Sequence, residues 1–165
     1  MKTPICDICL KSGILCPACR ENVNDGVVSE SDVDSLVKMK GVSEKIKTLQ
    51  GIHIKRLMNV DDVMIIVCKR GDATRIIGRG GTIVKNLAGV LGKKVRVVEE
   101  TDDPKIFLEM LVFPASVVSL GRVYRRSGDM MRMRVPAGTR LPIPMSTISK
   151  VFMKIFGKEI EMVSE

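Results

Sequence analysis

Two blocks of this sequence repeat each other, and they decide its fold. Residues 74–98 read TRIIGRGGTIVKNLAGVLGKKVRVV, and residues 139–163 read TRLPIPMSTISKVFMKIFGKEIEMV. A constant offset of 65 positions pairs Thr74 with Thr139, Arg75 with Arg140, Ile83 with Ile148, Lys85 with Lys150, Leu87 with Phe152, Gly92 with Gly157 and Lys93 with Lys158. A match at a fixed period indicates a duplicated structural unit.

The two copies differ at their glycines. The first block contains Gly78, Gly80 and Gly81, and the matching positions of the second block hold Ile143, Met145 and Ser146. Glycine lets the backbone adopt unusual dihedral angles and approach a ligand closely. We therefore expect the first unit to bind an extended, charged polymer and the second unit to support it.

The chain is basic and has enough apolar residues to build a core. Of its 165 residues, 27 are Lys or Arg and 19 are Asp or Glu, so the formal net charge is +8. Hydrophobic residues make up 45%, which argues against global disorder. A positive excess favours a polyanionic partner, either nucleic acid or an anionic membrane. The alternative is a charge that only keeps the protein dispersed.

The positive charge is concentrated in the duplicated units. From Lys69 to Arg96, eight basic residues accompany one acid, and the same holds from Arg122 to Lys154. A membrane is the weaker partner, because no apolar run reaches the length that spans a bilayer. Residues 1–10 lack the apolar stretch of a secretory signal, so we expect a cytoplasmic protein.

Four of the five cysteines follow the pattern C-x-x-C, six residues, C-x-x-C, and they are Cys6, Cys9, Cys16 and Cys19. Each C-x-x-C can aim two sulfurs at one point, and four thiolates complete a closed tetrahedral zinc site. A cytosolic location argues against disulfides, and a redox C-x-x-C normally lies in a βαβ setting. We predict one structural Zn²⁺, with an iron–sulfur cluster as the alternative. Cys68 is expected to be a buried strand residue.

The rest of the chain predicts two α+β units with the order α-β-β-α-α-β. In the first unit we expect a helix starting near residue 32, strands at 52–60, 63–69 and 94–100, a short helix at 72–77 and a helix over 82–91. In the second we expect helices starting at residues 103 and 144, and strands at 117–125, 130–135 and 159–163. Pro136, Pro142 and Pro144 should shorten or distort the helix that matches 72–77.

The segment Ile77-Gly78-Arg79-Gly80-Gly81-Thr82-Ile83-Val84 resembles the I-G-x-x-G-x-x-I core of a KH domain, with Val84 where Ile is usual. The preceding element order looks like the type II KH arrangement, and residues 98–120 are similar to the KH-to-KH junction of the NusA family. The chain as a whole looks most like the short archaeal NusA-like proteins. The resemblance implies two tandem type II KH domains, the second degenerate, preceded by a small zinc knuckle.

This interpretation divides the chain into a zinc-binding module at 1–24, a linker at 25–31, a first KH domain at 32–101 and a degenerate second KH domain at 102–165. The resemblance further implies a role in transcription elongation or termination. The expected partners are single-stranded RNA and, beyond it, RNA polymerase or a ribosomal or RNA-processing complex. We expect no membrane and no small-molecule substrate among them.

The expected RNA site centres on the GRGG loop. A KH loop of this kind clamps the backbone of a four-nucleotide single strand. The predicted RNA-binding residues are Arg75, Ile77, Gly78, Arg79, Gly80, Gly81, Lys85 and Arg96. Arg79 projects from the loop toward phosphate, Arg75 and Lys85 extend the basic track, and Ile77 contributes to an apolar groove for bases. The alternative is that GRGG is only a tight turn between helices.

The second unit contributes a further set of basic residues. Pro144, Ile143 and Met145 argue against direct clamping there, because proline removes an amide donor and the others add bulk. Secondary RNA contacts are expected from Arg125, Arg126, Arg132 and Arg134, and the alternative is a solvated strand face.

An enzyme is not expected, because the only histidine, His53, lies on a predicted strand and no Walker or dinucleotide-binding motif is present. The alternative that stays open is an RNA-associated adaptor, or a subunit of a ribosomal or RNA-processing assembly, in which the zinc module contacts a protein partner.

Overall fold

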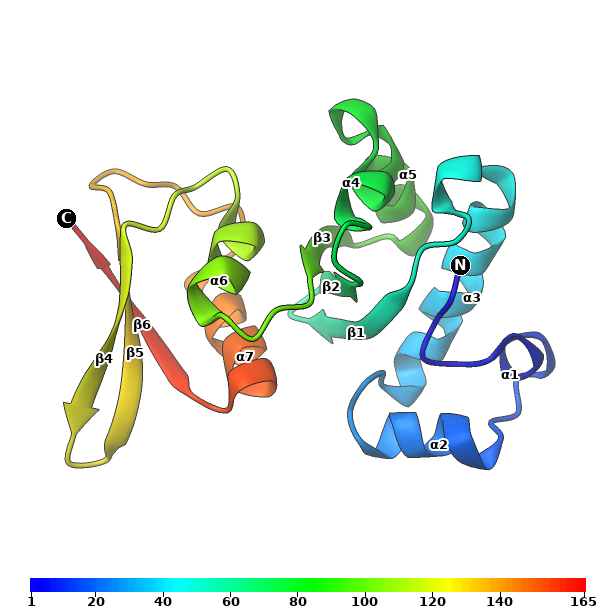
Figure 1. Ribbon diagram of the computed structural model, residues 1–165, viewed down its shortest axis with the longest axis horizontal. Helices are drawn as coiled ribbons and strands as arrows, with labels where there is room; N and C mark the ends of the chain where they lie inside the picture. The colour runs from blue at the N-terminus through cyan, green and yellow to red at the C-terminus, as the bar shows by residue number, and fades with distance from the viewer. The chain divides into compact units, whose positions relative to one another are not determined.

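Two separate three-stranded sheets organise the chain, one in each of its two units, Met1–Glu100 and Thr101–Glu165. The computed structural model describes all 165 residues (Figure 1). The first unit contains α1 (Asp7–Ser12), α2 (Pro17–Asn24), the 3-10 turn η1 (Glu30–Asp32), α3 (Val33–Lys45), η2 (Lys47–Leu49), β1 (Ile54–Val60), β2 (Val63–Cys68), α4 (Ala73–Ile77), η3 (Arg79–Gly81), α5 (Thr82–Leu91) and β3 (Lys94–Glu99). The second contains α6 (Pro104–Val112), β4 (Ser119–Arg125), β5 (Gly128–Val135), α7 (Met145–Phe156) and β6 (Glu159–Ser164).

The first sheet has the order β1-β2-β3, with β2 in the centre. β2 pairs antiparallel with β1 and parallel with β3. All six residues of β2, VMIIVC, are buried, as a continuous apolar run predicts. The two-residue turn between β1 and β2 places Asp61 and Asp62 at positive φ, which matches the twist of a tight hairpin.

Helices α3, α4 and α5 contribute to the core that lies on one face of this sheet. Leu36, Ile76 and Leu87 belong to the same buried cluster as Met64 and Ile66 of β2. Cys68 also belongs to this cluster and is fully buried, which confirms its prediction as a strand residue in the interior. The short helix α4 and the helix α5 are thereby held at the edge of the core where residues 78–81 connect them.

The N-terminal segment belongs to this core as well. Ile5, Leu10 and Val28 are buried in the cluster, so the residues expected to form a separate module and a linker pack onto the unit that follows. Backbone hydrogen bonds reinforce the attachment. Lys2 is bonded through its backbone to Ile52 and Ile54, and the amide of Leu57 donates to the carbonyl of Val27 over 3.1 Å. Isolated apolar side chains hold this mostly polar segment against the core. The polar composition of the segment gave no sign of this packing.

The second unit repeats the first at the spacing of the sequence repeat. β4 at 119–125 and β6 at 159–164 lie 65 positions after β1 at 54–60 and β3 at 94–99. The antiparallel register also repeats, since Leu57 faces Ile66 in the first sheet and Arg122 faces Met131 in the second. The parallel register is shifted by two residues, because Lys94 pairs with Val63 whereas Glu159 pairs with Met130. The duplication predicted from sequence therefore exists in the backbone, with one sheet realigned.

The core of the second unit is rich in phenylalanine. Phe107 of α6 and Phe152 of α7 are buried, and each lies against Phe156, with ring centroids 5.4 and 4.8 Å apart. The Asp103 carboxylate caps α6 by accepting bonds from two backbone amides. Residues 136–144 form turns and contain no counterpart of α4, as the three prolines of this segment predict.

Candidate metal centre and nucleic-acid interface

The four knuckle cysteines meet at one point. Their Sγ atoms all lie within 4.8 Å of one another, although the two pairs come from different helices. Cys6 and Cys16 are the residues before α1 and α2, and Cys9 and Cys19 lie one turn inside these helices. A tetrahedral ion with metal–sulfur bonds of about 2.3 Å has sulfur–sulfur edges of about 3.8 Å. The cluster therefore fits a single metal ion.

Backbone amides surround the sulfurs in a reciprocal pattern. The amide of Cys6 donates to Sγ of Cys19 over 3.2 Å, and the amide of Cys16 donates to Sγ of Cys9 over 3.1 Å. A hydrogen bond with the backbone of Cys19 lowers the pKa of Cys16 to about 7, whereas burial raises the pKa of Cys19 to about 12. A bound cation favours the thiolate form at every ligand, and the amides add further stabilisation.

The metal centre is fastened to the rest of the first unit. Cys9 and Cys19 are buried members of the core cluster that contains Leu36 of α3. The side chain of Lys40 on α3 forms a 2.6 Å ion pair with Asp7, which lies inside the first C-x-x-C. A metal ion here would organise part of the core and not only a peripheral knuckle.

The glycine loop, residues 78–81, connects α4 to α5. Gly78 adopts φ 76° and ψ 172°, a conformation essentially restricted to glycine. A Cβ atom at this position would lie 2.6 Å from Cγ1 of Ile83, so the first glycine is required by close packing within the turn. Its amide donates to the carbonyl of Thr74 over 2.9 Å, which ends α4.

Gly80 and Gly81 have different surroundings. A Cβ atom at Gly80 would meet nothing within 4 Å, although the residue has φ 63°. At Gly81 the nearest atoms would be Val84 Cγ1 at 3.8 Å and Lys85 Cε at 4.0 Å. The loop therefore presents open backbone at Gly80, and the side chain of Lys85 lies near Gly81. The packing of the turn accounts for the glycine at position 78. It does not account for the open space beside Gly80.

Exposed side chains border the loop on both sides. Arg79 lies at its tip and is exposed, and Lys85 is exposed on the first turns of α5. Ile77 keeps 37% of its surface accessible, which is unusual for an isoleucine at the end of a helix. The structure thus brings five of the expected RNA-binding positions around one loop and adds Lys85 above it: Ile77, Gly78, Arg79, Gly80 and Gly81.

Arg75 and Arg96 are placed differently from this group. Nε of Arg75 donates to the carbonyl of Thr48 over 3.1 Å, and its guanidinium also bonds the carbonyl of Gln50 and pairs with Asp72 at 3.6 Å. It ties α4 to the η2 turn. Arg96 alternates along β3 with Val95, which packs in the helix-side core, so Arg96 belongs to the opposite face of the sheet. Burial lowers the pKa of Arg96.

Three of the four arginines expected to make secondary RNA contacts are paired with acids. Glu161 of β6 accepts from Arg125 at 2.7 Å and from Arg132 at 2.6 Å, and the hydrogen bond from Arg132 is the main cause that lowers the pKa of Glu161. Arg134 pairs with Glu165 at 3.3 Å. Arg126 is exposed in the turn between β4 and β5. Sequence reasoning missed these acids because strand pairing brings Glu161 beside Arg132 from 29 positions away.

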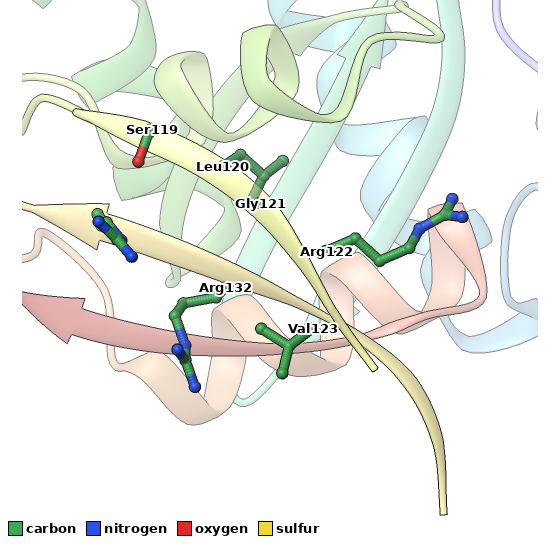
Figure 2. A pocket seen from close by; sticks show the side chains of 7 residues that line it. Ser119, Leu120, Gly121, Arg122, Val123 and Arg132 are labelled. Carbon is green, nitrogen blue, oxygen red and sulfur yellow. The ribbon is translucent and has the colours of Figure 1, made fainter. Parts of the chain in front are cut away.

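Beside these arginines, the second sheet is hollowed. The hollow has a volume of about 240 Å³ and is lined by Ser119, Leu120, Gly121, Arg122 and Val123 of β4 together with Arg132 and Arg134 of β5 (Figure 2). No sequence signal marks it, because it depends on which β4 residues stand opposite the arginines.

No helix is long and apolar enough to cross a lipid bilayer.

Comparisons with known proteins support a NusA-like relationship for part of the chain. The probable transcription termination protein NusA of Methanococcus vannielii is 37% identical over 66 residues, which is 40% of this chain and 38% of that protein's length. A solved structure described as "Crystal structure of APE1850" matches with a TM-score of 0.57 and 25% identity, over 81% of this chain and 99% of that one. No protein-family model matches the chain.

Removal of the metal should destabilise the whole first unit. Since Cys9 and Cys19 share a core with Leu36, we expect chelation, or the double change Cys9→Ser and Cys19→Ser, to lower Tm by about 10 °C or more. Elemental analysis measures the bound metal, and thermal unfolding measures Tm. Cys68→Ala is the control, which should retain the metal. A protein purified without metal whose Tm is unaffected by the double change would contradict this assignment.

The loop glycines should differ in what they contribute to stability. Gly78→Ala introduces both a forbidden dihedral and a contact with Ile83, so we expect a loss of at least about 2 kcal/mol. Gly80→Ala meets open space and should cost about 1 kcal/mol, from its positive φ alone. Urea unfolding of the two variants measures the difference. Equal losses would show that the loop is not packed as described.

Proposed function

We propose that the chain binds single-stranded RNA through the glycine loop of its first unit. The observation that carries the proposal is the open backbone at Gly80, bordered by the exposed cations of Arg79 and Lys85. Phosphate can approach such a backbone closely, and α5 begins directly after the loop, so its N-terminal end favours an anion. The exposed Ile77 offers an apolar contact for a neighbouring base.

The architecture supports two KH-like units of type II. The order α3-β1-β2-α4-loop-α5-β3 places the loop between two helices, and β2 runs parallel to β3. The second unit has the same strand order but lacks the glycines and the helix before them. We therefore assign the clamp to the first unit only. Arg75 acts in this assignment by positioning α4, since its guanidinium is engaged by carbonyls of residues 48 and 50.

For the cysteine cluster we propose one structural Zn²⁺. Four thiolates form a closed ligand set with no place for a substrate, which is typical of structural sites. Sulfurs within 4.8 Å of one another enclose the volume of a single ion, which favours zinc over an iron–sulfur cluster with several iron and sulfide ions between its ligands. The ion, when bound, neutralises thiolate charge and holds α1 and α2 together.

The cellular role we propose is that of a cytoplasmic NusA-like factor in transcription elongation or termination, without catalytic activity. The name of the Methanococcus vannielii relative and the partial identity to it support this assignment. We assign a structural role to His53, the only histidine. Its backbone amide donates to Asp72 over 2.9 Å, and burial lowers the pKa of its imidazole.

A second candidate function rests on two isoleucines. Ile8 and Ile14 are 78% and 74% exposed, although both lie beside the metal ligands. Large apolar side chains exposed on a rigid, metal-held knuckle are suited to contact another protein. In this alternative the chain is an RNA-associated adaptor, whose knuckle binds RNA polymerase or a ribosomal or RNA-processing complex.

The loop assignment is tested by RNA affinity at several salt concentrations. We expect the double variant Arg79→Asp and Gly80→Asp to bind a short single-stranded RNA pool at least about tenfold more weakly than the native chain, because two carboxylates repel phosphate. Gly41→Asp is a matched control, since position 41 is exposed on α3 with open space around it. Native-like binding by the double variant would refute the assignment.

The adaptor alternative predicts a different sensitivity. Ile8→Ser with Ile14→Ser should abolish RNase-resistant capture of purified RNA polymerase and leave RNA affinity unchanged, because the change removes only apolar surface. If capture by the native chain disappears after RNase treatment, the polymerase contact depends on RNA and the adaptor function is not supported.

A further inference from the structure

Small side chains opposite two arginines create the hollow on the second sheet. Directly paired residues of antiparallel strands share a face, and Ser119 pairs with Arg134 while Gly121 pairs with Arg132. The side chains of Ser119 and Gly121, a hydroxymethyl group and a hydrogen atom, are too small to fill the space beside the two long arginine side chains. The result is the cavity of about 240 Å³ along β4 and β5 (Figure 2).

The arginines are held by acids on the far side of this cavity. β6 pairs with β5 on the edge opposite β4, and it supplies Glu161, while Glu165 follows it. Glu161 engages Nε of Arg132, and Glu165 engages Nη1 of Arg134. A guanidinium carries five N–H donors in a planar fork, so each arginine retains donors besides the one bonded to its acid. The acids orient the two forks and leave a positive wall along the hollow.

The small side chains that line the hollow are specific to the second copy. The positions 65 residues earlier hold Ile54 and Arg56 on β1, where the second copy has serine and glycine. Val67 stands in β2 where Arg132 stands in β5, and it is buried. The first copy therefore has larger side chains at the positions of Ser119 and Gly121, and a buried valine at the position of Arg132. The two copies present different surfaces at matching strand positions.

We propose that this hollow binds a phosphate group of the RNA backbone, as a second contact within the second unit. The inference rests on the proposed RNA-binding function. Arginine forks recognise phosphate oxygens in a bidentate manner, the hydroxyl of Ser119 adds a donor, and the missing side chain at Gly121 allows close approach. The hollow, of about 240 Å³, has room for a phosphate group together with water molecules around it. Carboxylates of an acidic peptide could occupy the same arginine forks, and RNA is favoured over them because the proposed loop site of the first unit takes the same polymer.

Gly121→Asp tests this contact with little risk to folding. A Cβ atom at Gly121 meets nothing within 4 Å, and the residue does not have positive φ. We expect roughly three- to tenfold weaker binding of a single-stranded RNA of about twelve nucleotides, with a salt slope shallower by about one. Gly121→Ala, which adds one uncharged methyl group, should weaken binding less than Gly121→Asp does, and the equally charged Gly41→Asp should bind as the native chain does. An affinity of Gly121→Asp equal to that of Gly41→Asp would overturn the proposal.

RNA length separates this contact from the loop contact. A four-nucleotide RNA fills the loop alone, so Gly121→Asp should leave its affinity unchanged, whereas Arg79→Asp with Gly80→Asp should weaken it. If the loop variant loses affinity and Gly121→Asp loses none on either RNA, the second contact is overturned and the proposed function stands. Native binding by every variant overturns both.

Two further measurements identify the occupant. Glu161→Gln releases Arg132 and Arg125 from their acid, so we expect it to bind the longer RNA more tightly. In NMR spectra, the amide signal of Gly121 should shift with the longer RNA at micromolar concentration and with inorganic phosphate only at much higher concentration. A shift with inorganic phosphate but none with RNA would assign the hollow to free phosphate, and preferential competition by polyglutamate would assign it to acidic peptides; either overturns the proposal.

Discussion

The parallel pairing of β2 with β3 is the constraint on which the first unit depends. Parallel neighbours cannot be joined by a hairpin, so the chain must cross from the end of β2 to the start of β3 over one face of the sheet. Helices α4 and α5 are that crossover, and the glycine loop is its corner. The loop is exposed because it turns the chain between two helices whose apolar sides, at Ile76 and Leu87, are already committed to the core.

The same constraint explains how the two copies diverged. The second unit also needs a crossover, from β5 to β6, and it makes it with α7 and the turns of residues 136–144. Prolines and larger side chains stand at this corner in place of the glycines. The sheet differs as well, since the β5–β6 register is shifted by two residues and brings Glu161 beside Arg132. The copies share a frame and differ in the surface that each presents.

The cysteine cluster concerns the stability of the N-terminal residues. Residues 1–24 are too few to build a core of their own, and their two helices are short. Four thiolates gathered by an ion can hold those helices, and Ile5 and Leu10 then extend the core of the first unit. A bound metal would be coupled to the stability of the first unit through these shared contacts, so the cysteines would influence the loop without touching it.

The sequence by itself determined whatever depends on local pattern. Cysteine spacing indicated the cysteine cluster, and apolar periodicity indicated the strands and helices of the two repeated units to within a few residues. The glycines with Pro104 and Pro144 indicated where helices begin and end, whereas the short helices α1 and α2 were not predicted. The element order and the repeat followed from the same local signals. These features are readable because spacing along the chain sets them directly.

Only the tertiary structure decided which charges remain available. Arg75 and Arg79 look alike in sequence, yet Arg75 is held by carbonyls of residues 48 and 50, whereas Arg79 is exposed at the loop tip. Arg132 and Arg134 look like a free basic face in the sequence, yet they pair with Glu161 of β6 and with Glu165, which follows β6. The hollow beside them exists because Gly121 stands opposite Arg132. Each of these contacts joins residues far apart in the chain, and their pairing is set by strand register and packing, which local sequence patterns do not encode.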